Sequence, residues 1–164
     1  MTEAFLDPNG TISNNWDLTP GGGESAHEDV DEGATPDKND YISKSSDFAG
    51  CILEMENWSA ATATEIYIKC YAESNSGAEI IRCSYSTDSG VNFSTTKNIT
   101  TAGFPNADWQ ETAKWDISES NLDNLQIKLE KIANTNVITC YTVRVRIVYP
   151  SGEKVGKMMK INFN

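Results

Sequence analysis

The segment 137–149 constrains the fold more than any other part of the sequence. Its apolar and β-branched residues fall at every second position, whereas Arg144 and Arg146 occupy the opposite phase. Because successive side chains of a strand point to opposite faces, this period of two predicts a strand with one buried face. The segment is 13 residues long, whereas strands usually run ~3–10 residues, so we expect a bulge or bend within it. The residues expected on the buried face are Val137, Thr139, Tyr141, Val143, Val145, Ile147 and Tyr149.

Other short segments with strand-like alternation follow one another along the chain, and turn-forming residues separate them. No segment carries a convincing helical stripe. About eight or nine antiparallel strands predict an all-β fold, a two-sheet β-sandwich of the jelly-roll type. The remaining strands are expected at 41–46, 51–56, 66–72, 78–86, 91–99, 109–117, 125–129 and 155–163.

The turn cluster Asn75-Ser76-Gly77 lies between two of these strands and suggests a hairpin. Closing the loop at Ser76-Gly77 sets Cys70 opposite Cys83 and makes the two apolar faces coincide. All four cysteines, which are Cys51, Cys70, Cys83 and Cys140, fall inside predicted strands and show no close C-x-x-C spacing. Because no secretion signal is recognisable, we expect buried free thiols, with a Cys70–Cys83 disulfide as the alternative.

Charge is concentrated in residues 1–40, which contain ten Asp and Glu residues and a single cation, Lys38. The breaker-rich stretch 19–25 lies within this region. We therefore expect two parts, an extended acidic N-terminal arm over 1–40 and a β-sandwich domain over 41–164. Such an arm is either mobile and solvated or becomes ordered on a partner. The apolar residues that would anchor it on a partner are Phe5, Leu6, Trp16 and Leu18.

Composition excludes several classes of function. The formal net charge is −11, and nucleic-acid binding normally needs an excess of Lys and Arg, so DNA and RNA are excluded as partners. No apolar run reaches the ~18 residues that span a bilayer, which excludes a membrane partner. One histidine, no nucleophile motif and no spaced set of metal ligands predict a non-enzymatic protein with no catalytic residues, cofactor or metal.

Two further patterns are an Asp-box-like turn, which we interpret as structural, and a set of tryptophans, which are either structural or functional. The run Ser86-Thr87-Asp88-Ser89-Gly90 resembles the Asp-box, in which the Asp caps backbone N–H groups and the Gly forms a tight bend. We expect it to be a structural turn. The tryptophans Trp58, Trp109 and Trp115 either fill the sandwich core or form an exposed platform for a glycan. Since Trp109 and Trp115 are six residues apart, they would share one face of an unbroken strand with Ala113, which favours the core.

Several short motifs are similar to segments of phage virion proteins that contain a β-sandwich. The run 32–42 resembles a Glu-x(2–3)-Thr-Pro-Asp-x-x-Asp-Tyr-Ile segment that leads into the first strand of that group. Residues 124–127 match its Asn-Leu-Gln-Ile strand, and 147–150 match a closing Val-x-Tyr-Pro. The lead from Pro8 to Trp16 is also usual in that group.

The resemblance implies a non-enzymatic virion structural protein, a capsid decoration or head-fibre-like protein. It would dock on the major capsid or another virion protein through its N-terminal arm and sandwich surface. A homo-oligomer located in the virion, after assembly in the host cytoplasm, is expected. The alternative is a carbohydrate-binding module or a tail-associated receptor-binding domain that uses exposed aromatic residues.

Overall fold

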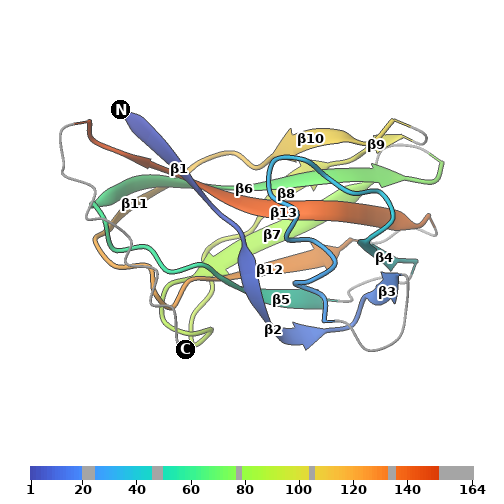
Figure 1. Ribbon diagram of the computed structural model, residues 1–164, viewed down its shortest axis with the longest axis horizontal. Helices are drawn as coiled ribbons and strands as arrows, with labels where there is room; N and C mark the ends of the chain where they lie inside the picture. Colours follow the sequence, from blue (N-terminus) through green and yellow to red (C-terminus); the bar gives the residue numbers. More distant parts are fainter. Residues whose placement is uncertain (20–24, 46–49, 77–78, 104–105, 133–135, 152–164) are drawn as a thin grey trace, which may run out of the picture.

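The protein is described from a computed structural model that covers residues 1–19, 25–45, 50–76, 79–103, 106–132 and 136–151. These residues form an all-β fold of two sheets packed face to face as a β-sandwich (Figure 1). Within the described part of the chain there is no helix, and hence none long and apolar enough to cross a membrane. The predicted strand at 155–163 lies outside the described residues.

The larger sheet has eight strands and the smaller has five. In the larger sheet the order is β10-β6-β13-β4-β3, with β1 also paired to β13, and β9 and β11 paired to β6. The smaller sheet has the order β2-β5-β12-β7-β8. All pairings are antiparallel except the short β6–β9 pair. The strands are β1 (Thr2–Leu6), β2 (Pro8–Asn14), β3 (Asp17–Thr19), β4 (Tyr41–Lys44), β5 (Gly50–Met55), β6 (Ala63–Ser74), β7 (Ile80–Ser86), β8 (Lys97–Thr100), β9 (Ala102–Gly103), β10 (Asp108–Glu111), β11 (Trp115–Glu119), β12 (Gln126–Lys131) and β13 (Ile138–Tyr149).

Strand β13 confirms the main features of the alternating segment. Val143, Val145 and Ile147 are fully buried between the sheets. The pairing of β13 with β6 shifts register between Cys140 and Thr142, which is the expected bulge. The extra residue reverses the alternation, so Cys140 belongs to the core cluster whereas Tyr141 does not. The sequence placed Tyr141 on the core face, because a strict period of two cannot anticipate where a bulge lies.

The hairpin predicted between 66–72 and 78–86 does not form. Strand β6 lies in the eight-stranded sheet and β7 lies in the five-stranded sheet, so the chain crosses the sandwich between them. Cys70 is paired with Val143 and with Gln110, and Cys83 is paired with Leu129 and Lys97. Two strands with matching apolar faces can pair side by side or face each other across a core, and the alternation pattern is the same in both cases.

All four cysteines are free and buried, as the sequence predicted. Burial raises the pKa of the Cys51 thiol to about 12 and also raises the pKa of Cys83. Because the thiolate is the reactive form, these groups should be inert in the folded protein. We expect dithionitrobenzoate to modify less than about one thiol in the native state and all four cysteines after denaturation. Rapid reaction of several thiols under native conditions would contradict the buried arrangement.

The first 19 residues contribute three strands to the two sheets, in the region expected to form an extended arm. Strand β1 pairs with β13, β2 pairs with β5, and β3 pairs with β4. Leu6 and Trp16 are buried in the core cluster, and the Asn14 side chain holds the backbone of Trp16 through two hydrogen bonds of 2.9 Å. Residue 40 therefore marks no boundary between an arm and the sandwich among the described residues.

Candidate functional site

The outer face of the eight-stranded sheet carries an unusual set of aromatic and basic side chains. In β6, Tyr67, Lys69 and Tyr71 alternate with the buried residues Ile66, Ile68 and Cys70. In β13, Arg144 and Arg146 alternate in the same way with the buried valines and isoleucine. Because β6 and β13 pair with Arg144 opposite Lys69 and Arg146 opposite Tyr67, these side chains lie next to one another.

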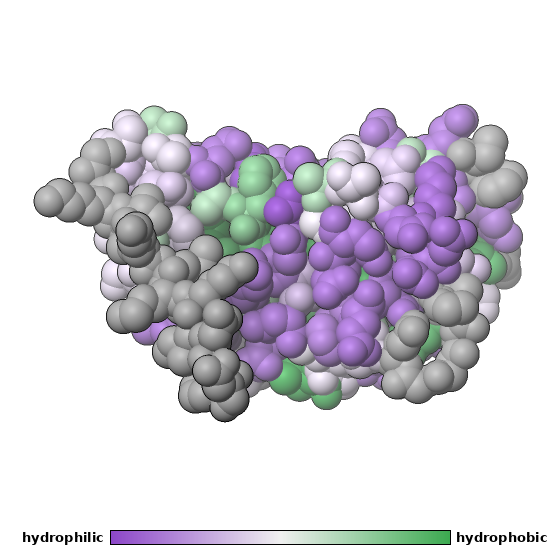
Figure 2. Space-filling model, in the orientation of Figure 1, coloured by the Kyte–Doolittle hydropathy of each residue, from purple (hydrophilic) through white to green (hydrophobic). Residues whose placement is uncertain are grey.

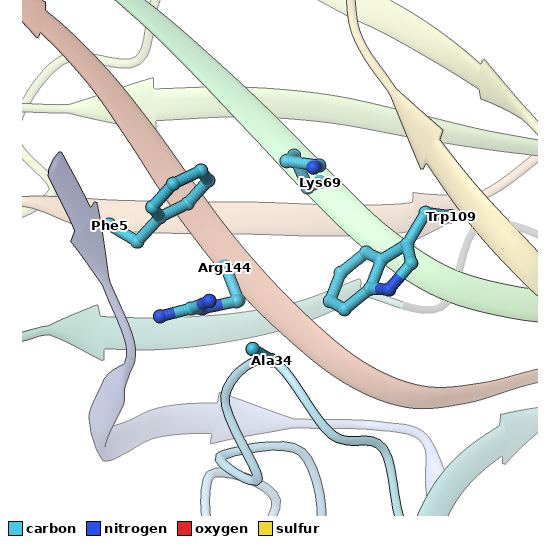
Figure 3. A pocket seen from close by; sticks show the side chains of 5 residues that line it. All are labelled: Phe5, Ala34, Lys69, Trp109 and Arg144. Atoms are coloured by element: carbon cyan, nitrogen blue, oxygen red, sulfur yellow. The ribbon is translucent and has the colours of Figure 1, made fainter. Parts of the chain in front are cut away.

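A pocket of about 230 Å³ opens on this face. Four strands and one loop supply its lining: Phe5 from β1, Lys69 from β6, Trp109 from β10, Arg144 from β13 and Ala34 from the loop before β4. Figure 3 shows the rings of Phe5 and Trp109 on opposite sides of the pocket, with Lys69 and Arg144 between them. In the space-filling view an apolar hollow lies over the region where β1 crosses β13, and hydrophilic residues border it (Figure 2).

Arg144, which lines the pocket, is held in place by Asp7. Its Nε donates to Asp7 Oδ1 at 2.5 Å and its Nη2 donates to Asp7 Oδ2 at 3.2 Å. The guanidinium also lies over the Phe5 ring, 4.7 Å from the ring centroid. A two-point arginine–carboxylate pair fixes orientation as well as charge. The turn between β1 and β2, which carries Asp7, therefore fixes both Arg144 and the Phe5 ring that it supports.

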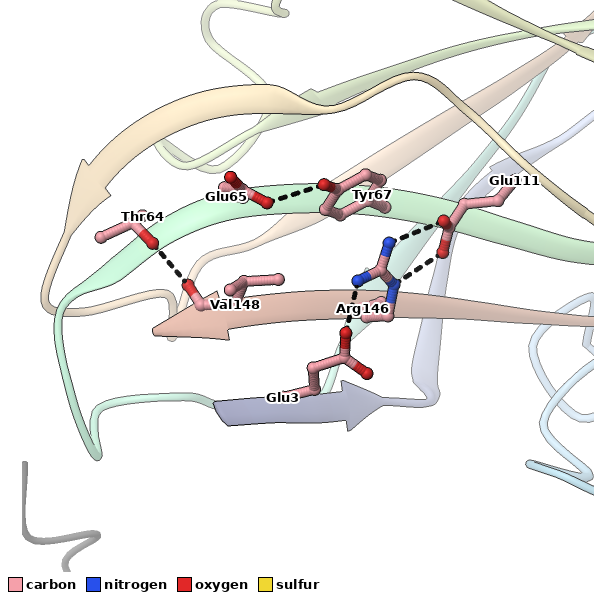
Figure 4. Close-up of polar contacts among 7 residues, drawn as sticks. All are labelled: Glu3, Thr64, Glu65, Tyr67, Glu111, Arg146 and Val148. Atoms are coloured by element: carbon pink, nitrogen blue, oxygen red, sulfur yellow. Dashed lines mark hydrogen bonds and ion pairs between the residues drawn. The ribbon is translucent and has the colours of Figure 1, made fainter. Parts of the chain in front are cut away.

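Arg146 makes a second fixed network beside the pocket (Figure 4). It donates to both carboxylate oxygens of Glu111, at 2.8 and 2.7 Å, and to Glu3 at 2.7 Å. These bonds link β1, β13 and β10 across the sheet. The hydrogen bond to Glu111 is the main cause of the raised pKa of Arg146. The guanidinium also lies 3.7 Å from the centroid of the Tyr67 ring.

A chain of aromatic contacts extends from the pocket across the strands. The ring centroids of Trp109 and Tyr71 are 5.7 Å apart, those of Tyr71 and Tyr141 are 6.1 Å apart, and those of Tyr141 and Tyr41 are 5.6 Å apart. The bulge in β13 is what turns Tyr141 out of the core and into this row. These separations suit edge-to-face or tilted packing, which holds the partly buried Trp109, Tyr71 and Tyr41 rings against the buried Tyr141.

The three tryptophans considered for a glycan platform occupy different places. Trp58 is 6% exposed, packs against Tyr149 and donates to the carbonyl of Ala61. Trp115 is 5% exposed and donates to the carbonyl of Thr95. Both belong to the core, whereas Trp109 lines the pocket. Trp109 and Trp115 do not share a strand, because the chain leaves β10 at Glu111 and begins β11 only at Trp115.

The four residues considered as partner anchors also differ in their burial. Leu6 and Trp16 are buried in the core, and Leu18 is partly buried against it. Phe5, at 37% exposed, is the one whose ring lines the pocket. Sequence reasoning missed Lys69 and Arg144 as pocket residues. The available signal was their position in the polar phase of two strongly alternating strands, which predicts an outward direction but not a shared site.

Metal sites and the Asp-box were also considered in the structure. Among the described residues no group of three or more His, Cys, Asp or Glu side chains is placed to hold a metal ion. The Asp-box is a turn, as expected: Asp88 accepts a hydrogen bond from the Asn92 backbone N–H at 2.9 Å, and Gly90 has φ of +81°. The positive φ favours glycine at this position, and a Cβ there would also displace Gln126 Oε1, which would lie 2.6 Å away.

The loop that bears Ala34 contains a carboxyl group with an altered pKa. Burial raises the pKa of Glu32 from its ordinary value to about 7, and nearby Asp31, Asp40 and Asp37 add to the effect. The folded state thus holds this proton more tightly than the unfolded state does. The stability contribution from Glu32 is therefore full below the unfolded pKa, near ~4.3, and is lost as pH rises toward 7.

The variant Glu32→Gln should reduce this pH dependence. We expect the free energy of unfolding of the wild-type protein to fall more than that of the variant between pH 4.5 and pH 8, because glutamine cannot ionise. Urea denaturation at both pH values measures the difference. Identical pH dependence in the two proteins would show that Glu32 does not titrate in the folded loop as described.

Comparison with known proteins gives structural similarity alone. No protein-family model matches the sequence, and no curated protein was found to be similar in sequence. The CBM35 from Cellvibrio japonicus Abf62 superposes with a TM-score of 0.50 at 8% identity, covering 92% of this chain and 100% of that chain. A Xyl-CBM35 in complex with a glucuronic acid containing disaccharide gives a TM-score of 0.50 at 9% identity, covering 88% and 93%. The Agl-KA catalytic domain gives 0.48 at 13% identity, covering 92% of this chain but 28% of that chain.

These matches correct the interpretation as a phage virion protein. The two structural neighbours that reach a TM-score of 0.50 are carbohydrate-binding modules and not virion proteins, so the expected capsid decoration or head-fibre role is wrong. The motifs that suggested it, such as residues 32–42, are short loop and strand segments. Part of that run, residues 33–35 and 38–40, forms turns and bends before β4. Such segments recur in many unrelated β-sandwiches because turns select the same few residue types.

Proposed function

We propose that the protein is a non-catalytic carbohydrate-binding module that binds its ligand on the outer face of the eight-stranded sheet. The observation that carries this proposal is the pocket in which Phe5 and Trp109 face each other across Lys69 and Arg144. A sugar ring has apolar C–H faces and a rim of hydroxyl groups. Two aromatic side walls with a few fixed polar groups between them match that pattern.

The fixed geometry of the pocket supports a binding role. Arg144 is held by Asp7, and the neighbouring Arg146 is held by Glu111 and Glu3, so the polar groups need little ordering when a ligand arrives. Preorganised groups lose less conformational entropy on binding. The similarity in fold to carbohydrate-binding modules is consistent with this proposal.

The carboxylates around the pocket favour binding over glycoside hydrolysis. Hydrolysis usually requires two carboxylic groups that flank the scissile bond, one as acid and one as base or nucleophile. The five residues that line the pocket include no carboxylate. Asp7 and Glu111, which reach this face, are each committed to two contacts with an arginine.

Affinity electrophoresis of the wild-type protein tests the proposal. The gels contain one soluble polysaccharide each, covering neutral glucans, xylans, mannans and galactans as well as uronic-acid and sulfated polymers. We expect retardation on at least one of them relative to a gel without polysaccharide. Unchanged mobility on the whole panel, together with no heat of binding to the corresponding oligosaccharides at millimolar concentration, would contradict the proposal.

A further inference from the structure

Lys69 lies in the pocket without a carboxylate partner among the described residues. Its cross-strand neighbours are Arg144 on β13 and Glu111 on β10. The carboxylate of Glu111 is occupied by Arg146, and Asp7, the carboxylate that neutralises Arg144, makes both of its described contacts with that arginine. Two cations placed opposite each other in a sheet are unfavourable unless their charges are balanced. Among the described residues, Arg144 has a carboxylate partner in Asp7, whereas Lys69 has none.

The immediate surroundings of the Lys69 ammonium are aromatic. The Nζ atom lies 5.5 Å from the centroid of Phe5 and 5.1 Å from the centroid of Trp109. Ring faces attract a cation but accept no strong hydrogen bond. The three N–H donors of the ammonium therefore face a pocket wall or the open pocket, and the structure assigns them no protein acceptor among the described residues.

The sign of the local charge is opposite to that of the whole protein. The chain has a formal net charge of −11, yet the pocket lining holds two cations and no anion. A neutral ligand does not require this arrangement. An anionic group placed beside Lys69 would gain a charge-assisted hydrogen bond in a partly enclosed site, where such bonds are stronger than in water.

From these observations we infer that the ligand is an acidic glycan whose anionic group binds Lys69 while the sugar ring packs between Trp109 and Phe5. This inference rests on the proposed carbohydrate-binding function and names the ligand class of the same pocket. The anionic group is a uronate carboxylate or a sulfate ester, since both present negatively charged oxygens to an ammonium. Lys69 is then the residue that determines specificity for acidic over neutral sugars.

Matched pairs of polysaccharides test the inference, because each pair differs only in its acid group. Polygalacturonate is compared with its fully methyl-esterified form, alginate with its carboxyl-reduced form, and a sulfated galactan with the same galactan after desulfation. We expect the protein to bind the acidic member of at least one pair and to bind its neutral counterpart about 10- to 100-fold more weakly. Preference within the uronate pairs or within the sulfate pair identifies the source of the anion.

Three lysine variants link this preference to the pocket. Lys69→Met keeps most of the aliphatic stem and removes the charge, so it should weaken acidic-glycan binding about 10- to 100-fold. Lys69→Arg restores a cation and should recover part of the affinity. Lys128→Met is the control, since Lys128 lies on β12 of the other sheet and pairs with Glu130 at 2.7 Å. It removes one positive charge, as Lys69→Met does, and should bind like the wild type.

The results separate failure of this inference from failure of the proposed function. Equal binding of the acidic and neutral members of every pair, or unchanged affinity in Lys69→Met, overturns the acidic-glycan inference. If Trp109→Ala still abolishes binding of a neutral glycan in that case, carbohydrate binding in the pocket stands. Absence of binding to every polysaccharide overturns both.

Discussion

Replacing Trp16 with alanine is expected to cost about 3–5 kcal/mol of unfolding free energy, as large-to-small changes of buried aromatic residues do. Trp16 is 4% exposed and belongs to the core between the two sheets. Alanine would leave a cavity there that the paired strands around it could close only in part. Chemical denaturation monitored by circular dichroism measures the loss.

Ile12→Ala provides the control for that prediction. Ile12 lies in β2, only four positions from Trp16, but its side chain is 52% exposed, so the substitution should change stability by less than about 0.5 kcal/mol. If Trp16→Ala were as stable as Ile12→Ala, the first 19 residues would not be an integral part of the sandwich core. An extended acidic N-terminal arm over residues 1–40, separate from the sandwich, would then be supported.

Trp109→Ala is expected to give the largest effect on binding with little effect on stability. The substitution removes one aromatic wall of the pocket, together with the ring contacts to Tyr71 and Lys69. Loss of a central aromatic anchor typically weakens binding by about 30-fold or more. Because Trp109 is only partly buried, we expect a stability loss of only about 1 kcal/mol. Isothermal titration with an oligosaccharide that binds the wild type measures the affinity.

Trp115→Ala is the matched control for Trp109→Ala, because it removes the same type of side chain from β11, the next strand along the chain. Trp115 is buried, and its indole N–H donates to the Thr95 carbonyl at 2.8 Å. We expect this variant to lose about 3–5 kcal/mol of stability and, under conditions where it remains folded, to bind with nearly wild-type affinity. The reverse pattern, with binding lost in Trp115→Ala and kept in Trp109→Ala, would place the site elsewhere.

The alternation of apolar and polar residues predicted individual strands and the fold class correctly. It did not predict which strands pair with one another. It predicted β13, because the spacing of Val143, Val145 and Ile147 reflects the pleat directly, whereas the bulge was expected from the length of the segment. It could not tell that β6 and β7 face each other across the core, because both arrangements bury the same residues. Pairing depends on long-range contacts that a local pattern does not contain.

The acidic character of residues 1–40 was misleading for a physical reason. The interpretation from composition treated all of these carboxylates as solvated. Two of them instead form ion pairs with arginines from the C-terminal part of the sequence. Asp7 binds Arg144 and Glu3 binds Arg146. These outward arginines of β13 neutralise part of the N-terminal charge and help hold β1 at its place beside β13. The paired residues are more than 130 positions apart in the sequence, so the sequence alone did not indicate that they form ion pairs.

The pocket could not be predicted from the sequence. Trp109 and Phe5 were recognised, but in two different hypotheses, as part of a glycan platform and as a partner anchor. Only the register of β1, β13, β6 and β10 brings these rings together around Lys69 and Arg144. The pairing of β13 with β6 shifts at the bulge between Cys140 and Thr142, and no local sequence signal fixes the position of that bulge.

The most direct test of carbohydrate binding on this face is the response of the indole N–H signals to a glycan. The chain has four tryptophans, and each gives one Nε1–H resonance in a ¹⁵N-labelled sample, assigned by single Trp→Phe substitutions. Titration with oligogalacturonate, and with the neutral oligosaccharides of any polymer that retards the protein on gels, should shift the Trp109 signal strongly. The signals of buried Trp16, Trp58 and Trp115 should move little. A saturable interaction that leaves Trp109 unmoved, or no saturable shift with any glycan, would contradict the account.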